Sequence, residues 1–121
     1  MAWHYNNATG VMTGPDGVVV GTGYSGNGAG LNNPAAEAIP DVGPIPEGVW
    51  RIGTAFDHPH LGPVAMVLIP LALLTASTRS GFFIHGDNIQ MNRSASHGCI
   101  ILGRPIREEI AQSTDRTLIV V

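Results

Sequence analysis

The chain has 121 residues, about the length of one domain, and an apolar fraction of 44% is sufficient for a single hydrophobic core. Charged residues make up 12%, lysine is absent and the net charge is −3, so the chain lacks the basic face of a nucleic-acid-binding protein. The most apolar stretch, 64–76, is too short for a membrane helix and contains Pro70, and the N-terminal residues show no signal-peptide pattern.

Sixteen glycines and nine prolines predict many turns and few long helices. In chain order, we expect a hairpin from residues 10–12 and 18–20, and then strands at 49–52, 64–69, 81–85, 99–102 and 117–121. One helix is predicted from Pro105 to Gln112, because proline suits the first helical position and Ile106 and Ile110 lie four residues apart. These elements predict a mostly β domain, a sandwich or partial barrel with one short helix.

Residues 21–26 match the dinucleotide-binding pattern G-x-G-x-x-G and follow a predicted strand. That mechanism requires a helix to begin at the motif, so that the helix N-terminus holds a pyrophosphate. The next residues, 27–34, are rich in glycine and asparagine and end in proline, which is incompatible with a helix. We therefore interpret the motif as a glycine-rich loop that borders a binding cleft.

The segment from 82 to 102 contains the residues that suggest chemistry. Cys99 is the only cysteine, so it forms no intramolecular disulfide, and it is either a small core residue or a reactive thiol. A reactive thiol needs a histidine within hydrogen-bond reach and donors for an oxyanion. His85 ends one apolar strand and Cys99 begins another, so the two side chains can meet if these strands pair. Gly98 lets backbone N–H groups face an oxyanion, and Ser96 and His97 lie in the same turn.

Two alternatives follow from the same residues. A lone cysteine beside Ile-Ile-Leu is often buried filler, although Ser-His-Gly is an unusual way to begin a hydrophobic strand. A zinc site is the other alternative, since His85, Asp87, His97 and Cys99 are all possible ligands, but one intervening residue in each pair is not a usual zinc spacing. His97 also competes with His85 as the base, because residues two apart in an extended strand share a face.

Ile84-His85-Gly86, followed by Ser96-His97-Gly98-Cys99-Ile100, resembles the signature of L,D-transpeptidases of the YkuD type. Residues 23–26, 32–34 and 41–48 resemble a small branch of that family, the effectors delivered by bacterial type VI secretion. The resemblance spans about residues 3–103. It implies one L,D-transpeptidase-like catalytic domain over 1–121, acting on peptidoglycan stem peptides without a cofactor.

The resemblance assigns a role to each matching residue. Cys99 matches the nucleophile and His85 the general base, with the carbonyl of Gly86 orienting the imidazole. The N–H groups of Gly98 and Cys99 match the oxyanion hole, and Ser96 and His97 match residues that shape the turn. Cys99 would attack the third residue of a tetrapeptide stem, expel the terminal D-alanine and leave a thioester. Water, a free D-amino acid or a second stem would then resolve that thioester.

The chain departs from larger L,D-transpeptidases in two places. Only ten residues separate His85 from Ser96, and Ile101 stands where those enzymes often carry Arg or Asn. Both differences suggest a smaller, more open site that favours stem trimming over cross-linking. The candidates for substrate contacts are Tyr24, Arg79, Arg93 and Asp87, whereas His58 and His60 are expected in a surface loop.

An effector of this kind would be made in the cytoplasm without a signal peptide and delivered to the periplasm of target bacteria. Its expected partners are components of the type VI secretion machinery and an immunity protein. The alternative function, on the same residues, is a non-catalytic peptidoglycan-binding module that retained the fold.

Overall fold

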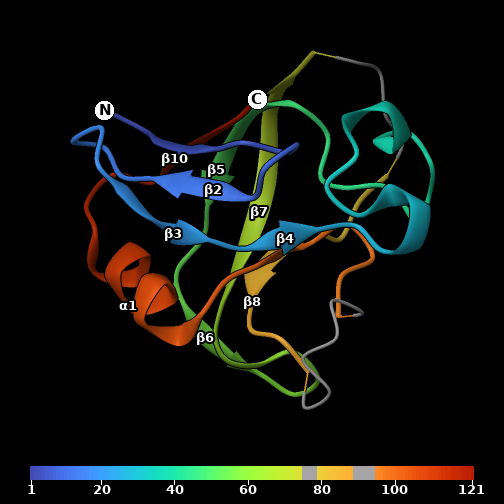
Figure 1. Ribbon diagram of the computed structural model, residues 1–121. Coiled ribbons are helices and arrows are strands. Elements are labelled where there is room, and N and C mark those ends of the chain that lie inside the picture. Colours follow the sequence, from blue (N-terminus) through green and yellow to red (C-terminus); the bar gives the residue numbers. More distant parts are fainter. Residues whose placement is uncertain (75–78, 89–94) are drawn as a thin grey trace.

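The computed structural model describes residues 1–74, 79–88 and 95–121 (Figure 1). Its strands and helices within those ranges are β1 (Trp3–Tyr5), β2 (Val11–Thr13), β3 (Val19–Thr22), β4 (Tyr24–Ser25), η1 (Gly28–Gly30), η2 (Pro34–Ala36), β5 (Gly48–Ile52), β6 (Phe56–His58), β7 (Gly62–Leu73), β8 (Phe83–His85), β9 (Ile100–Ile101), α1 (Arg104–Gln112) and β10 (Thr117–Val120). The two η elements are short 3-10 helices. No helix of the described residues is long and apolar enough to cross a membrane.

The strands form one curled sheet in the order β3-β2-β1-β10-β5-β7-β8-β9-β4, with β6 paired to β7. The two edge strands, β3 and β4, are separated in the chain by Gly23 alone, so the sheet returns almost to its starting point (Figure 1). The fold is therefore a nearly closed, mostly β barrel-like domain with one short helix, which confirms the predicted fold class.

The core fills the inside of this sheet. Alternating residues of β1, β5 and β10 point inward, and Trp3, Trp50 and Leu118 are at most 2% exposed. Helix α1 adds Ile110, which is fully buried, and Ile106, which is partly buried. The predicted spacing of these two isoleucines thus places both against the core.

The predicted strands are present, with different ends. The hairpin is formed by β2 and β3, which pair in antiparallel fashion. Strand β7 continues past Pro70, because that residue pairs with Trp50 beside a register shift, where a missing N–H is tolerated. Strand β9 begins at Ile100, so Cys99 lies in the bend that precedes it.

Candidate active site

Cys99 and His85 lie on neighbouring strands. Strands β8 and β9 pair in parallel, with Ile84 opposite Ile100 and His85 opposite Ile101. Both Ile84 and Ile100 are fully buried, so the residues on either side of them face away from the core. Cys99 and His85 therefore point to the same face, and they are offset by two residues along the strands, about 7 Å. The predicted pairing is present, but the two residues are diagonal neighbours rather than directly opposite.

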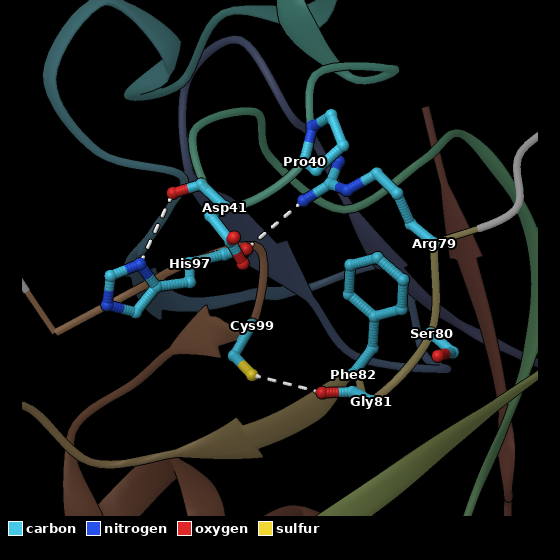
Figure 2. Close-up of a pocket in the computed structure, with 8 residues that line it drawn as sticks. All are labelled: Pro40, Asp41, Arg79, Ser80, Gly81, Phe82, His97 and Cys99. Carbon is cyan, nitrogen blue, oxygen red and sulfur yellow. Dashed lines mark hydrogen bonds between the residues drawn. The ribbon is translucent and has the colours of Figure 1, made fainter.

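The thiol of Cys99 contacts backbone groups of the chain before β8. Its Sγ accepts a hydrogen bond from the N–H of Phe83 at 3.3 Å. The thiol also donates to the carbonyl of Gly81 at 3.8 Å, as Figure 2 shows. Within the described residues, no hydrogen bond joins this sulfur to an imidazole. Burial raises the pKa of the Cys99 thiol, while the Phe83 N–H and the Arg79 charge oppose that rise. The resting thiol is therefore protonated at neutral pH.

His85 is 4% exposed, and its ring is fixed by its own loop. Its Nδ1 lies 2.8 Å from the carbonyl of Gly86, and because a carbonyl only accepts, Nδ1 carries the proton and Nε2 the lone pair. Burial is the main cause that lowers the pKa of His85; the charges of Arg107 and His58 lower it further, while the Gly86 bond and Asp87 oppose them. A neutral imidazole with a free Nε2 is the form that a general base requires.

His97 faces away from the thiol. Its ring is exposed, and Nδ1 lies 3.2 Å from the carbonyl of Asp41 (Figure 2). Gly98 has a φ of 131°, a conformation that L residues rarely adopt, and it bends the chain between His97 and Cys99. The expectation that His97 and Cys99 share a face assumed an extended strand, and this bend corrects it.

The turn before Cys99 is held by a buried hydroxyl. Ser96 Oγ accepts from the N–H groups of Gly26 at 2.9 Å and Gly98 at 3.1 Å, and it donates to the carbonyl of Cys99 at 2.6 Å. Ser96 thus shapes this turn. The N–H of Gly98, one of the two expected oxyanion donors, is already bonded to Ser96 Oγ. It can bind an oxyanion only if the turn changes.

The glycine-rich loop supplies two further contacts to this turn, and sequence reasoning did not assign them. Ser25 is fully buried; its Oγ donates to the carbonyl of Gly98 at 3.0 Å and accepts from Ile45 N at 2.9 Å. Asn27 donates through Nδ2 to the carbonyl of Ser96 at 2.8 Å. The three-residue η1 follows the loop, so no helix begins at the motif as nucleotide binding would need.

Arg79 organises the wall of the cleft. Its guanidinium donates to the carbonyls of Pro44 at 2.9 Å, Gly43 at 2.9 Å and His97 at 3.1 Å, and also to the carbonyl of Glu37. It also lies 5.1 Å from the ring centroid of Phe82. These contacts join the 37–44 segment to the turn at His97. They give Arg79 a structural role, and its direct contact with substrate stays a prediction.

Two of the other candidate substrate residues, Tyr24 and Asp87, contact each other. Tyr24 Oη donates to Asp87 Oδ1 at 2.6 Å and accepts from the N–H of Ala95 at 3.1 Å, so these residues hold one another in place. Arg93 lies outside the described residues.

His58, expected in a surface loop, ends β6, and its ring centroid lies 5.4 Å from that of Phe83. Only the pairing of β6 with β7 brings His58 towards β8, so no local sequence pattern indicated this position.

A cleft of about 330 Å³ opens beside the thiol. Its walls come from three separate segments of the chain, and it is lined by Pro40, Asp41, Arg79, Ser80, Gly81, Phe82, His97 and Cys99 (Figure 2). This volume is at the lower end of the range for small-ligand sites. Across residues 1–74, 79–88 and 95–121, no group of three or more His, Cys, Asp or Glu side chains is placed to hold a metal ion.

The barrel, with a His-Gly strand beside a Ser-His-Gly-Cys turn, is similar to the catalytic domains of L,D-transpeptidases. Residues 20–118 match the Tlde1 domain, and the chain therefore belongs to that family of type VI secretion L,D-transpeptidase effectors. Comparison with curated protein sequences finds no match.

Two solved structures share the fold. The NMR structure of the catalytic domain of an Enterococcus faecium L,D-transpeptidase has a TM-score of 0.56 and 18% identity, over 99% of this chain and 95% of that domain. The crystal structure of an E. faecium L,D-transpeptidase with a cysteine-to-serine substitution has a TM-score of 0.54 and 16% identity, over 99% of this chain and 49% of that one.

Proposed function

We propose that this protein is a cysteine-dependent L,D-carboxypeptidase or L,D-transpeptidase that acts on the tetrapeptide stems of peptidoglycan. The observation that carries the proposal is the placement of Cys99 and His85 on one face of paired strands, with the lone pair of His85 on Nε2. Membership of the Tlde1 family supports a transpeptidase-like effector that acts on peptidoglycan. Cys99 serves as the nucleophile and His85 as the general base.

The first half-reaction begins with a neutral thiol and a neutral imidazole. The thiol proton leaves the Gly81 carbonyl and moves to Nε2 of His85 as Sγ attacks the carbonyl carbon of the third stem residue. The N–H of Cys99 stabilises the oxyanion that forms. As the tetrahedral intermediate collapses, the C–N bond breaks, Nε2–H protonates the departing amine, and D-alanine leaves behind a thioester.

The second half-reaction releases the stem. His85 takes a proton from water or from the amine of a free D-amino acid, which attacks the thioester carbon, and the C–S bond breaks as the proton returns to sulfur. Water gives carboxypeptidase action, and a D-amino acid gives exchange.

The proposed setting is the periplasm of a target bacterium, reached by type VI secretion. Family membership supports delivery to target cells. A cell that makes such an enzyme needs an immunity protein, and blocking the open cleft beside Cys99 is the most direct way for it to act.

The test is mass spectrometry of purified tetrapeptide muropeptides after incubation with the native protein, with Cys99→Ala, and with Thr114→Ala as a control at an exposed position outside the cleft. We expect loss of the terminal alanine with the native protein and Thr114→Ala but not with Cys99→Ala. Turnover by Cys99→Ala, or none by a folded native protein, contradicts the proposal. Added D-amino acid distinguishes exchange from hydrolysis.

One observation favours the non-catalytic alternative. The Cys99 thiol is directed to the Gly81 carbonyl rather than to an imidazole, and burial raises its pKa. A peptidoglycan-binding module would bind isolated sacculi equally well as native protein and as Cys99→Ala, and neither protein would change the muropeptides.

A further inference from the structure

A second cavity, of about 350 Å³, lies on the His85 side of the site. Tyr24 and Ile101 both line it, and they are paired across β4 and β9, while Ile101 is also paired with His85. Asp87, two residues after His85, forms another part of its wall. The cavity therefore lies beyond His85 as seen from Cys99, on the side opposite the first cleft.

The wall of this cavity contains two arginines of α1. Arg107 is only 7% exposed; its Nε donates to the carbonyl of Leu102 at 3.0 Å, and its Nη1 donates to the carbonyl of Pro63 at 2.5 Å. Its Nη2 has no hydrogen-bond partner among the described residues, and it lies against Gly86, where an added Cβ would be 2.7 Å away. A buried guanidinium with an unused donor edge beside a cavity is suited to an anion.

Three neighbouring features decide the sign of the charge that this cavity accepts. Arg104 is exposed and pairs with Glu108 at 2.8 Å, a surface ion pair that is readily exchanged. The nine-residue α1 begins at the cavity, and its N-cap, Gly103, provides no side-chain acceptor for the first N–H groups. Asp87 also lines the cavity, but its Oδ1 already accepts from Tyr24 and from the N–H of residue 88. Among the residues that line the cavity, two guanidinium groups face one carboxylate, and Glu108 reaches Arg104 only from the exposed surface of α1.

The proposed reaction determines which part of the substrate lies on this side of His85. The imidazole protonates the departing amine, so the residue that leaves has its nitrogen at Nε2 and extends past His85. An extended residue spans about 3.5 Å, which brings the terminal carboxylate of D-alanine towards the second cavity and within reach of an arginine. A D-amino acid that attacks the thioester retraces this path, so its carboxylate occupies the same place.

We propose that the second cavity is a carboxylate subsite, in which Arg107 and Arg104 bind the terminal carboxylate of the D-amino acid that leaves or enters. This inference rests on the proposed function, and it explains why the enzyme acts at the end of a stem. A free carboxylate on the terminal residue, rather than an amide or a longer chain, is the feature that the subsite selects.

The experiment compares two pairs of ligands. A synthetic stem tetrapeptide is paired with its C-terminal amide as donor, and D-alanine is paired with D-alaninamide as acceptor. The ratio of kcat/KM for acid over amide is measured for the native protein, Arg104→Gln and Arg107→Gln, with Arg51→Gln as a control that makes the same charge change at an exposed position on β5. The ratio does not depend on the folded fraction, so partial unfolding of Arg107→Gln leaves it interpretable. Binding of the same ligands to Cys99→Ala is measured by NMR titration.

We expect the native protein and Arg51→Gln to prefer the acid by about 10- to 100-fold, as a charge-assisted hydrogen bond allows, and Arg107→Gln to lose most of that preference. A preference in the donor pair alone assigns the subsite to the leaving residue, and one in the acceptor pair alone assigns it to the entering residue. No preference in either pair, or a preference that survives in both arginine variants, overturns the proposal. Acid-selective binding to Cys99→Ala without turnover by the native protein supports the subsite and contradicts the proposed reaction. Turnover without acid preference supports the reaction and contradicts the subsite.

Discussion

Replacement of Arg79 tests how the cleft is held together and how the thiol is tuned. The guanidinium donates to four backbone carbonyls and lies near Cys99, so it has both a bonding and an electrostatic role. Arg79→Lys keeps the charge but removes the forked donors, and Arg79→Gln removes the charge. The two variants therefore separate the roles.

The stability effect follows from the carbonyl contacts. A hydrogen bond from a charged donor contributes about 1.5–3 kcal/mol, and water replaces part of this because Arg79 is only half-buried. For four contacts we expect a loss of about 3 kcal/mol in the free energy of unfolding for either variant, or a fall in Tm of roughly 12 °C. Urea and thermal denaturation measure this loss. A native-like Tm for Arg79→Lys would show that these contacts contribute little to stability.

The electrostatic effect is read from thiol reactivity. Arg79 lowers the pKa of Cys99 against the effect of burial, so Arg79→Gln should slow alkylation by iodoacetamide at pH 7, well below Tm. Arg79→Lys should react at a rate closer to that of the native protein, and Arg51→Gln should match it. Equal rates for native protein and folded Arg79→Gln would refute the influence of this charge on the thiol.

Three other predictions concern the site. Gly98→Ala should destabilise the protein by about 2 kcal/mol or more in urea denaturation. The reason is that φ is 131° and an added Cβ would lie 2.5 Å from Arg79 Nη2 and 2.7 Å from Phe82 Cε1. An unchanged denaturation midpoint would contradict the described turn. Tyr24→Phe removes a hydroxyl that both donates and accepts, and we expect a loss of about 1–2 kcal/mol in the same assay, whereas a neutral effect would show that this hydroxyl is not stabilising. Because burial lowers the pKa of His85, the imidazole stays neutral below its ordinary value of 6.5, so the acid limb of kcat/KM should lie below pH 6.5; a limb above that value would argue against His85 as the base.

The elements of the fold could be predicted because each has a local signal. Proline at the start of α1, the turn sequence between β2 and β3, and the apolar runs of β5, β7 and β10 depend on neighbouring residues only. The ends of strands could not be predicted as well, because they depend on partners. Pro70 is accommodated within β7 by a register shift opposite β5, and no window of sequence around Pro70 contains that information.

The pairing of Cys99 with His85 was predictable in part. An apolar strand that ends in His-Gly and another that follows His-Gly-Cys indicated neighbours, but the parallel direction that makes them diagonal is a property of the sheet order. Arg107 and His58 were missed for the same reason, since both reach the surroundings of His85 only through tertiary packing. Neither residue carries a local pattern that distinguishes it from a solvated side chain.

The glycine-rich segment 21–26 shows how a nucleotide-like pattern arises from a different physical requirement. It connects the two edge strands of the curled sheet, where backbones approach closely. A Cβ at Gly23 would lie 2.0 Å from the carbonyl oxygen of Ile101, and one at Gly26 would lie 2.3 Å from that of Gly30. Ser25 and Gly26 of this segment, together with the adjacent Asn27, hold the turn that precedes Cys99. Closing the sheet and positioning the thiol therefore depend on one short stretch of chain, so a substitution that opens the sheet at Gly23 should also misplace Cys99.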